Sequence, residues 1–430
     1  MLLSFRVANH GSLREPQELN FVPAYEDERP AVTVAAIYGA NASGKSTMVD
    51  AFEFFGRAVR DSQARWLPGA DVPRRPFLLD HASRHERSSY AVDILLDGVR
   101  YVYGFAVTDT AVAEEWLYSY PKGRKRVLFE RDGTAMTYGA TLTGERVAIE
   151  RTVRPNSLYL SAAAQASHEQ LGAVWRALTE GRRVVGDSDR QFFTQAGAVL
   201  TWIYQVLDEE GLPVGTDVLT AADLGVHGIR RSPEKSEFGR KLRFRDGRAP
   251  QDEVETALMD AASGSLQFVH KVGDEEFLLP AAAESAGTKT WLNLVTMALR
   301  AILDGTSLWV DEIDVSLHPL LTAKLLSLFQ NPELNPLGAQ LVFTTHDASL
   351  LGTMLGEQVL RRDQVWFVEK APKTGASELY PLSDFKPRKG ENFERRYLAG
   401  SYGAVPLLPE TAFEDMVRKY WGAHGKAVPA

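Results

Sequence analysis

The chain has 430 residues, of which 44% are hydrophobic and 24% are charged, with a formal net charge of −8 and no cysteine. This composition is typical of a soluble globular protein with two or three folding units, and it excludes disulfides, thiol chemistry and a surface that coats nucleic acid everywhere. No apolar run approaches the roughly 18 residues that cross a bilayer, and the N-terminus turns polar too soon for a signal peptide, so we expect a cytoplasmic protein without membrane contact.

The first 60 residues predict two short strands, a buried strand and a helix. Apolar and polar residues alternate in "LSFRVAN" and "QELNFVP", which is the period of a half-buried strand. "AVTVAAIYG" is continuously apolar, as expected of a central strand. Apolar residues then recur at helical spacing, which predicts a helix from about Gly44 to Arg60.

Between the buried strand and the helix, residues 39–46 read "GANASGKS" and match the phosphate-loop pattern G-x-x-x-x-G-K-[ST]. The glycines let successive N–H groups wrap a phosphate, and the helix N-terminus adds its partial positive charge. We expect Lys45 to reach the β- and γ-phosphates of ATP and Ser46 to bind Mg²⁺. An ordinary strand-to-helix turn is the alternative. The expected nucleotide-binding residues here are Gly39, Asn41, Ala42, Ser43, Gly44, Lys45, Ser46 and Thr47.

Residues 88–160 predict a small antiparallel meander. "SYAVDILLDGVRYVYGFAV" alternates with period two around Asp97-Gly98, which is a strong hairpin pattern, and "RVLFERDGTAMTYG" repeats it around Asp132-Gly133. From about residue 165 to 265 the chain is expected to be mostly helical and irregular, without the sustained heptads of a coiled-coil arm.

Residues 276–370 alternate between helical and strand patterns, which favours a parallel sheet with crossover helices. Asp311 and Glu312 end the apolar strand "SLWVDE". We expect Asp311 to coordinate Mg²⁺ and Glu312 to activate the attacking water as a general base; two acids that cap the next segment are the alternative. His346 ends the strand "LVFTTHD", where it is expected to hydrogen-bond the γ-phosphate and the water.

A hydroxyl-rich turn precedes the helix of "TWLNLVTMALRAILDG". The N-terminus of that helix is a second place where a phosphate can bind. A plain helix cap by Ser285 or Thr288 is the alternative. The expected nucleotide-binding residues of this turn are Ser285, Ala286, Gly287 and Thr288.

We call residues 285–288 the signature turn. The chain resembles the ABC-type ATPase heads of SMC, RecF and overcoming-lysogenisation-defect proteins in the order of four motifs: the phosphate loop, the signature turn, "DEIDVSLHP" and the strand-end histidine. The resemblance implies that the signature turn contacts ATP held by another copy, in a head-to-head dimer with two ATP. "DVSLHP" (314–319) is similar to the family's D-loop, with His318 where transporter ATPases usually carry aspartate.

The opening "FRVANHGSLREPQEL", "RRDQVWFVEK" and "LSDFKPRKGENFERRYLAGSYGAVP" resemble the RloA-like ATP-binding proteins of bacterial abortive-infection and restriction-linked operons. The resemblance implies a slow Mg²⁺-dependent ATPase that senses or regulates a separate small effector in anti-phage defence, with a phage-derived trigger. No second active site is expected after His346, so the chain is not expected to be the toxin itself. The glutamine of the Q-loop is not assigned, and Gln63 and "RPFLLD" are the nearest places.

The alternative function is that of a DNA-repair or chromosome-associated SMC/RecF-like ATPase. It depends on the basic segment 230–248, which either contacts nucleic acid or forms a solvated surface. A third hypothesis for the function is a nucleotide-dependent scaffold protein.

The expected fold is α/β, a P-loop ABC-type ATPase head with an antiparallel β lobe and a helical insertion. Its expected parts are the N-terminal head and β lobe (1–160), the insertion (161–270), the C-terminal head (271–385) and a tail that docks a partner or packs on the core (386–430).

Overall fold

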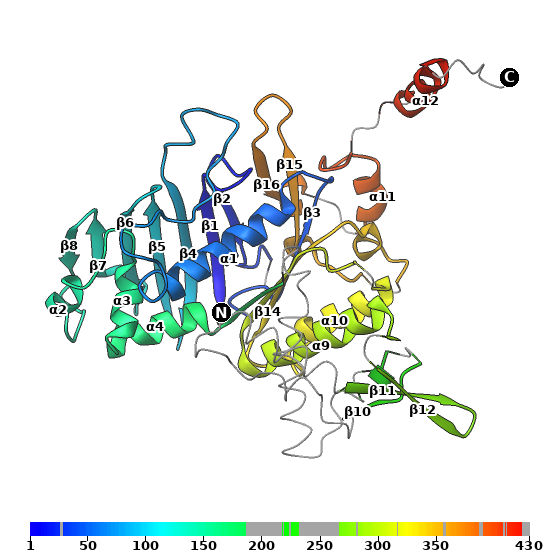
Figure 1. Ribbon diagram of the computed structural model, residues 1–430, viewed down its shortest axis with the longest axis horizontal. Helices are drawn as coiled ribbons and strands as arrows, with labels where there is room; N and C mark the ends of the chain where they lie inside the picture. Colours follow the sequence, from blue (N-terminus) through cyan, green and yellow to red (C-terminus); the bar gives the residue numbers. More distant parts are fainter. Residues whose placement is uncertain are drawn as a thin grey trace, which may run out of the picture.

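The computed structural model describes residues 1–25, 29–185, 217, 219–222, 225–231, 266–280, 283–315, 317–355, 358–386, 390–406, 409 and 411–423. Figure 1 shows an antiparallel sheet beside a mixed, mainly parallel sheet, with helix α1 (Lys45–Asp61) running along both. The expected α/β class with an antiparallel lobe is therefore confirmed.

The antiparallel sheet has the strand order β2-β1-β4-β5-β6-β7-β8. The predicted hairpin at Asp97-Gly98 is present, and φ is +49° and +74° at these residues, as a two-residue turn between twisted strands requires. The strands are β1 (Leu2–Ala8), β2 (Gln17–Asn20), β4 (Ser88–Leu96), β5 (Val99–Val107), β6 (Val112–Tyr120), β7 (Arg126–Asp132) and β8 (Ala135–Tyr138).

The second sheet has the order β16-β15-β3-β14-β13-β9, in which only the β15–β16 pair is antiparallel. Every residue of β3, β13 and β14 is buried, as their continuous apolar patterns predict. Strand β9 comes from the segment expected to be an insertion and pairs with β13 at the sheet edge. The strands are β3 (Val34–Tyr38), β9 (Arg182–Val185), β13 (Ser307–Val310), β14 (Gln340–Thr345), β15 (Val365–Lys370) and β16 (Ser377–Pro381).

A stack of aromatic rings joins the two sheets through α1. Trp309 of β13 is fully buried, and its ring lies 3.8 Å from that of Phe52 of α1 at an interplanar angle of 13°. The Phe5 ring of β1 meets the Trp309 ring edge-on at 6.0 Å. The helix that follows the phosphate loop is thus held between a strand of each sheet, and its start is fixed relative to both.

The remaining elements surround these two sheets. Helices α9 (Ala286–Asp304) and α10 (Pro319–Gln330) are the crossovers that the sequence predicts on either side of β13. A three-stranded sheet comprises β10 (Gly228–Arg231), β11 (Leu266–Val272) and β12 (Glu275–Pro280). The other helices are α2 (Val147–Glu150), α3 (Tyr159–Gln165), α4 (Glu169–Thr179), α11 (Phe393–Leu398) and α12 (Ala412–Ala423), with 3₁₀ turns at Ala348–Leu351, Arg362–Gln364 and Leu382–Phe385. Among the described helices, none has the length and apolarity to cross a membrane.

Candidate nucleotide site

Three parallel strands bring the expected groups to one edge of the sheet. The register pairs Thr345 of β14 with Tyr38 of β3, and Val310 of β13 with Phe343 of β14. The phosphate loop, the acids and the histidine each follow one of these strands. Because the carboxyl ends of parallel strands meet at one edge, segments about 270 residues apart in sequence become neighbours.

The phosphate loop presents a helix start without a side-chain cap. Gly44 is the N-cap of α1, with φ of +112°, and it makes no side-chain cap hydrogen bond. A Cβ at Gly39 would lie 2.5 Å from the carbonyl oxygen of Val368, and one at Gly44 would lie 2.4 Å from Ser377 Oγ, so glycine is required at both positions. The start of α1 thus has no side-chain cap, which is the kind of helix terminus that can bind an anion.

Lys45 and Ser46 are the first two residues of α1. Lys45 is buried, and its Nζ donates hydrogen bonds to the carbonyl oxygens of Gly39 and Ala40 at 2.9 and 3.2 Å. Burial lowers the pKa of Lys45, against the opposing carboxylates of Asp311, Glu312 and Asp314. Ser46 is exposed at the mouth of the loop. An ammonium and a hydroxyl thus lie next to each other at the start of the helix.

Two hydroxyls from distant parts of the chain brace this loop. Ser377 Oγ of β16 donates to the carbonyl oxygen of Ser43 and lies 2.8 Å from Ser12 Oγ. Ser12 Oγ in turn donates to Thr47 Oγ1 at 3.2 Å. The sequence offered no signal for Ser12 or Ser377, because isolated serines are common and Ser377 lies far from the loop in sequence. These hydrogen bonds join the phosphate loop to one segment near the N-terminus and to one in the C-terminal part of the chain.

The acids after β13 are held by a threonine of the neighbouring strand. Thr344 Oγ1 donates to Asp311 Oδ1 at 2.5 Å and accepts a hydrogen bond from Glu312 N at 2.7 Å. Glu312 has φ of +51°, a region that side chains other than glycine, asparagine and aspartate seldom occupy. Such strain of about 1–3 kcal/mol is typical of functional positions that the surrounding structure holds in place. Thr344 is a positioning residue that the sequence analysis did not single out.

His346 follows β14 and is exposed. Its backbone N–H lies 3.4 Å from Asp314 Oδ1. Surrounding protein atoms that reduce hydration of the ring lower the pKa of His346, and the Lys45 cation lowers it further, against the carboxylates of Asp314, Glu312 and Asp311. The Lys45 ammonium, the carboxylates of Asp311, Glu312 and Asp314 and the His346 imidazole are thus close enough to influence one another's charge. The imidazole is neutral at pH 7 because its pKa lies below the ordinary value of about 6.5.

The signature turn opens a 19-residue helix, as expected, and Ser285 caps it. Ser285 Oγ accepts from Thr288 N at 3.0 Å and lies 2.8 Å from Thr288 Oγ1. Ser285 and Ala286 are exposed, Gly287 is half-buried, and Thr288 is buried. In the described part of the chain, no hydrogen bond joins residues 285–288 to the phosphate loop of the same chain. His318, in the segment similar to a D-loop, caps α10 by accepting from Leu320 N.

Of the two places considered for a Q-loop, only one lies beside the start of α1. Gln63 is at the far end of the helix, where its Nε2 donates to the Thr152 carbonyl. Arg75 of "RPFLLD" instead pairs with Asp50 of α1 at 3.0 Å, and its carbonyl accepts from Gly11 N. The loop 75–80 is therefore the segment that connects the antiparallel sheet to the nucleotide end of α1.

The basic segment 230–248 lies outside the described residues apart from Arg230 and Arg231, and Arg230 pairs with Glu276 at 2.7 Å. In the described ranges, no group of three or more His, Asp or Glu side chains is placed to hold a metal ion.

Comparisons with known proteins agree with the P-loop fold. The model of a family described as "AAA domain, putative AbiEii toxin, Type IV TA system" matches residues 34–352, which is more than half of the chain. No curated protein matches.

Similar solved structures include an Smc head bound to the C-winged helix domain of ScpA, with 16% identity, TM-score 0.44, and coverage of 90% of this chain and 99% of that one. The SMC head domain from Thermotoga maritima has 12% identity, TM-score 0.38, and coverage of 88% and 98%. An Smc head domain with an extended coiled coil, bound to the C-terminal domain of ScpA derived from Pyrococcus furiosus, has 15% identity, TM-score 0.36, and coverage of 90% and 97%. At these levels of similarity the structures do not assign a function.

The backbone strain at Glu312 can be tested by replacing this residue with glycine, which relieves it. Glycine adopts positive φ freely, so we expect Glu312→Gly to raise the free energy of unfolding by about 1 kcal/mol relative to Glu312→Gln, after the entropic cost of glycine. Both variants remove the same charge, so the charge does not contribute to their difference in stability. Urea unfolding of the nucleotide-free protein measures it. A glycine variant less stable than the glutamine variant would contradict the assigned strain.

The charges around His346 predict how its pKa responds to substitutions of its neighbours. NMR of its ring should give a pKa below the ordinary histidine value. Lys45→Ala should raise that pKa because the cation opposes the imidazolium, and Asp314→Asn should lower it further because the carboxylate favours the imidazolium. A matched change at the exposed Lys373 should leave it unchanged. A His346 titration that is the same in the Lys45→Ala variant would show that the two groups do not share a site.

Proposed function

The chain belongs to the family of AAA domains whose description names the putative AbiEii toxin of a type IV toxin–antitoxin system, and from this premise we propose that it is a slow, magnesium-dependent ATPase that regulates a separate effector in bacterial anti-phage defence. That it is a P-loop ATPase follows from its family and fold. The main support for the proposal is that the uncapped start of α1 lies at the same sheet edge as Asp311, Glu312 and His346.

The site supports hydrolysis of the bond between the β- and γ-phosphates. The N–H groups of residues 42–46 and the Lys45 ammonium bind the phosphates and hold the γ-phosphate in place. Glu312 orients a water molecule and takes its proton as the water oxygen attacks phosphorus. The bond to the β–γ bridging oxygen then breaks, and ADP leaves. His346, neutral at pH 7, donates a hydrogen bond to the γ-phosphate or the water.

The residues present fit a magnesium ion. Ser46 offers an exposed hydroxyl, and Asp311 is a half-buried carboxylate whose Oδ1 accepts from Thr344, with Oδ2 left for the ion or its water. Oxygen donors of this kind are those that Mg²⁺ prefers. When bound, the ion neutralises phosphate charge, and Thr344 keeps the Asp311 carboxylate turned toward it.

We place the signature turn in the site of a second copy. Ser285 and Gly287 would contact the γ-phosphate held by the partner's loop, with Ala286 and Thr288 shaping the turn, so two ATP molecules would join two heads. The exposure of Ser285 and its position at the start of a 19-residue helix support this role. Capping and phosphate binding are compatible, because the Ser285 cap engages only the N–H of Thr288 and leaves the N–H groups of Ala286 and Gly287.

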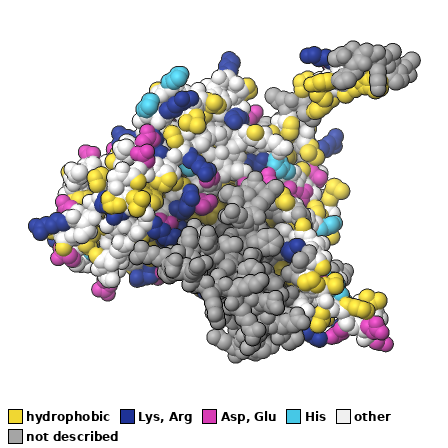
Figure 2. Space-filling view, in the orientation of Figure 1, with side chains coloured by type: hydrophobic (Ala, Val, Ile, Leu, Met, Phe, Trp, Pro, Cys, Tyr) yellow, Lys and Arg dark blue, Asp and Glu magenta, His cyan; other side chains and the backbone are white. Residues whose placement is uncertain are grey.

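The tail supports a regulatory role through a protein partner. Helix α12 stands apart at the end of the described chain in Figure 1, and hydrophobic side chains gather along it in Figure 2. Its exposed apolar residues recur at helical spacing, as expected of a docking helix. They are Phe413, Met416, Val417, Tyr420 and Trp421. We therefore propose α12 as the docking element of the tail, because Phe393, Tyr397 and Tyr402 before it are buried in the core. The segment 161–270 is not wholly a lid or interaction region, since its strand β9 belongs to the parallel sheet.

The family description supports a second candidate, in which the chain is itself the toxin. Expression of the chain alone separates the two. A regulator should leave growth normal without its effector gene. Growth arrest by the chain alone that disappears in the Lys45→Ala variant would favour the toxin and contradict the regulator.

The proposed roles predict distinct losses of activity. Glu312→Gln should lower ATP hydrolysis by about 10²–10⁴ while ATP still binds, because only the base is lost. Lys45→Ala should lose binding itself. The exposed Glu333→Gln is the matched control and should hydrolyse ATP at the parent rate. Phosphate release and binding of a fluorescent ATP analogue measure both steps. A Glu312→Gln protein that hydrolyses ATP at the parent rate would contradict the role of Glu312 as the general base.

A further inference from the structure

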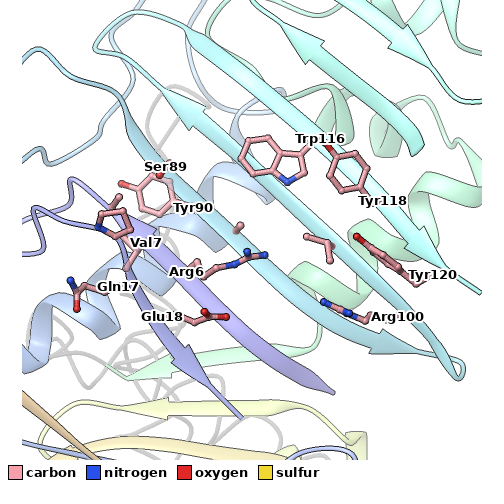
Figure 3. Close-up of a pocket in the computed structure, with 14 residues that line it drawn as sticks. Arg6, Val7, Gln17, Glu18, Ser89, Tyr90, Arg100, Trp116, Tyr118 and Tyr120 are labelled. Atoms are coloured by element: carbon pink, nitrogen blue, oxygen red, sulfur yellow. The ribbon is translucent and has the colours of Figure 1, made fainter. Parts of the chain in front are cut away.

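The outer face of the antiparallel sheet, opposite α1, carries a hollow of about 540 Å³ (Figure 3). Its floor includes three aromatic residues of β6 that alternate with inward-facing residues: Trp116, Tyr118 and Tyr120. Arg6 from β1 and Arg100 from β5 extend over the same face. Neither the nucleotide site nor the proposed docking tail uses this surface.

The aromatic residues form a row with a regular spacing. Alternate residues of a strand lie about 7 Å apart, roughly twice the 3.4 Å step between bases of a duplex. The Trp116 indole packs against Gly104 of β5, where a Cβ would lie 2.4 Å from its Cζ2 atom. Glycine therefore lets the ring lie close to the sheet, and Figure 3 shows the rings of Trp116 and Tyr118 face-on. The row offers platforms to bases that are unstacked from one another.

Cations lie beside the two tyrosines of the row, and an acid shares this part of the face. Glu130 lies opposite Trp116 in the β6–β7 register, accepts a hydrogen bond from Tyr118 Oη at 2.7 Å and lies 4.0 Å from Lys125 Nζ. Arg6 is exposed and lies opposite Glu18 in the β1–β2 register. The Arg100 guanidinium bonds to Asp93 and lies 4.9 Å from the centre of the Tyr120 ring. Lys125 Nζ lies 3.5 Å from the centre of the Tyr118 ring. The single acid that lines the hollow is Glu18.

The row continues into a strongly basic hairpin. The connection after β6 reads "PKGRKR" (121–126) and is exposed throughout. It begins directly after Tyr120, so basic side chains follow the last aromatic platform. They are Lys122, Arg124, Lys125 and Arg126. Aromatic platforms beside a basic track are the arrangement that binds single strands without sequence preference.

We propose that this face binds single-stranded nucleic acid, with bases stacked on Trp116, Tyr118 and Tyr120 and phosphates paired with Arg6 and the basic hairpin. Lys125 and Arg100, both about half exposed, lie over the tyrosine rings and are ion-paired with Glu130 and Asp93, so a phosphate that binds either cation competes with a carboxylate. A duplex cannot bind in this way, because its bases are paired and stacked on one another. The inference does not depend on the ATP site.

The test is fluorescence anisotropy of labelled 12-nucleotide dT and rU strands and of a 12-base-pair duplex, with the full chain and no ATP. We expect one or both single strands to bind, and binding to weaken as salt rises from 50 to 200 mM, since bound phosphates release counterions. The duplex should bind at least tenfold more weakly. Trp116→Ala should weaken single-strand binding about tenfold, the loss of one stacking platform.

Trp116→Phe keeps a platform and should bind within about threefold of the parent, which guards against a variant that has merely unfolded. Tyr420→Ala removes an exposed aromatic residue of α12 and should bind like the parent. Reversal of Lys122 and Arg124 to glutamate should reduce both the affinity and the salt dependence. Absence of single-strand binding, equal affinity for the duplex, or parental binding by Trp116→Ala would each overturn the proposal.

Discussion

The parallel pairing of β14 with both β3 and β13 is the constraint on which the rest of the site depends. It places the residues that follow Tyr38, Val310 and Thr345 at one edge of the sheet. Each strand is wholly buried, so a register shift would expose apolar residues and is strongly disfavoured. The edge is therefore rigid, and the phosphate loop, the acids and the histidine keep their positions without a bound nucleotide.

Around that edge, contacts between distant segments hold the reacting groups in place. Ser377 joins the phosphate loop to β16, and Thr344 joins the two acids to β14. On the other side, the buried His10 bonds to Asp50 of α1 and to Tyr90 of β4, which connects the helix to the antiparallel sheet. Arg6 lies four residues before His10 on the same strand and turn. A ligand on the outer face of that sheet would thus bind close in sequence to a contact of α1.

The sequence was sufficient to predict those features that one short segment specifies by itself. The phosphate loop, the Asp97-Gly98 hairpin and the buried strands each have a spacing or turn chemistry that a single segment displays, and the structure has them all. The roles of Thr344 and Ser377 had no such signal, because their partners lie 33 and 334 residues away. The positive φ of Glu312 was equally hidden, since it is imposed by the contact with Thr344 rather than by the residue type. The platform at Trp116 depends on Gly104 of the neighbouring strand, a pairing visible only once the register is known.

We propose that each chain holds half of a shared ATP site. The most direct measurement is the mass in solution of the Glu312→Gln protein with and without ATP and magnesium, beside the same protein carrying Ser285→Arg. We expect ATP to double the mass of the first protein and to leave that of the second unchanged, because the arginine side chain would occupy the space of the γ-phosphate that the partner's loop holds. A mass that ATP does not change in Glu312→Gln, or that rises equally with Ser285→Arg, would contradict a site completed by the signature turn of a second copy.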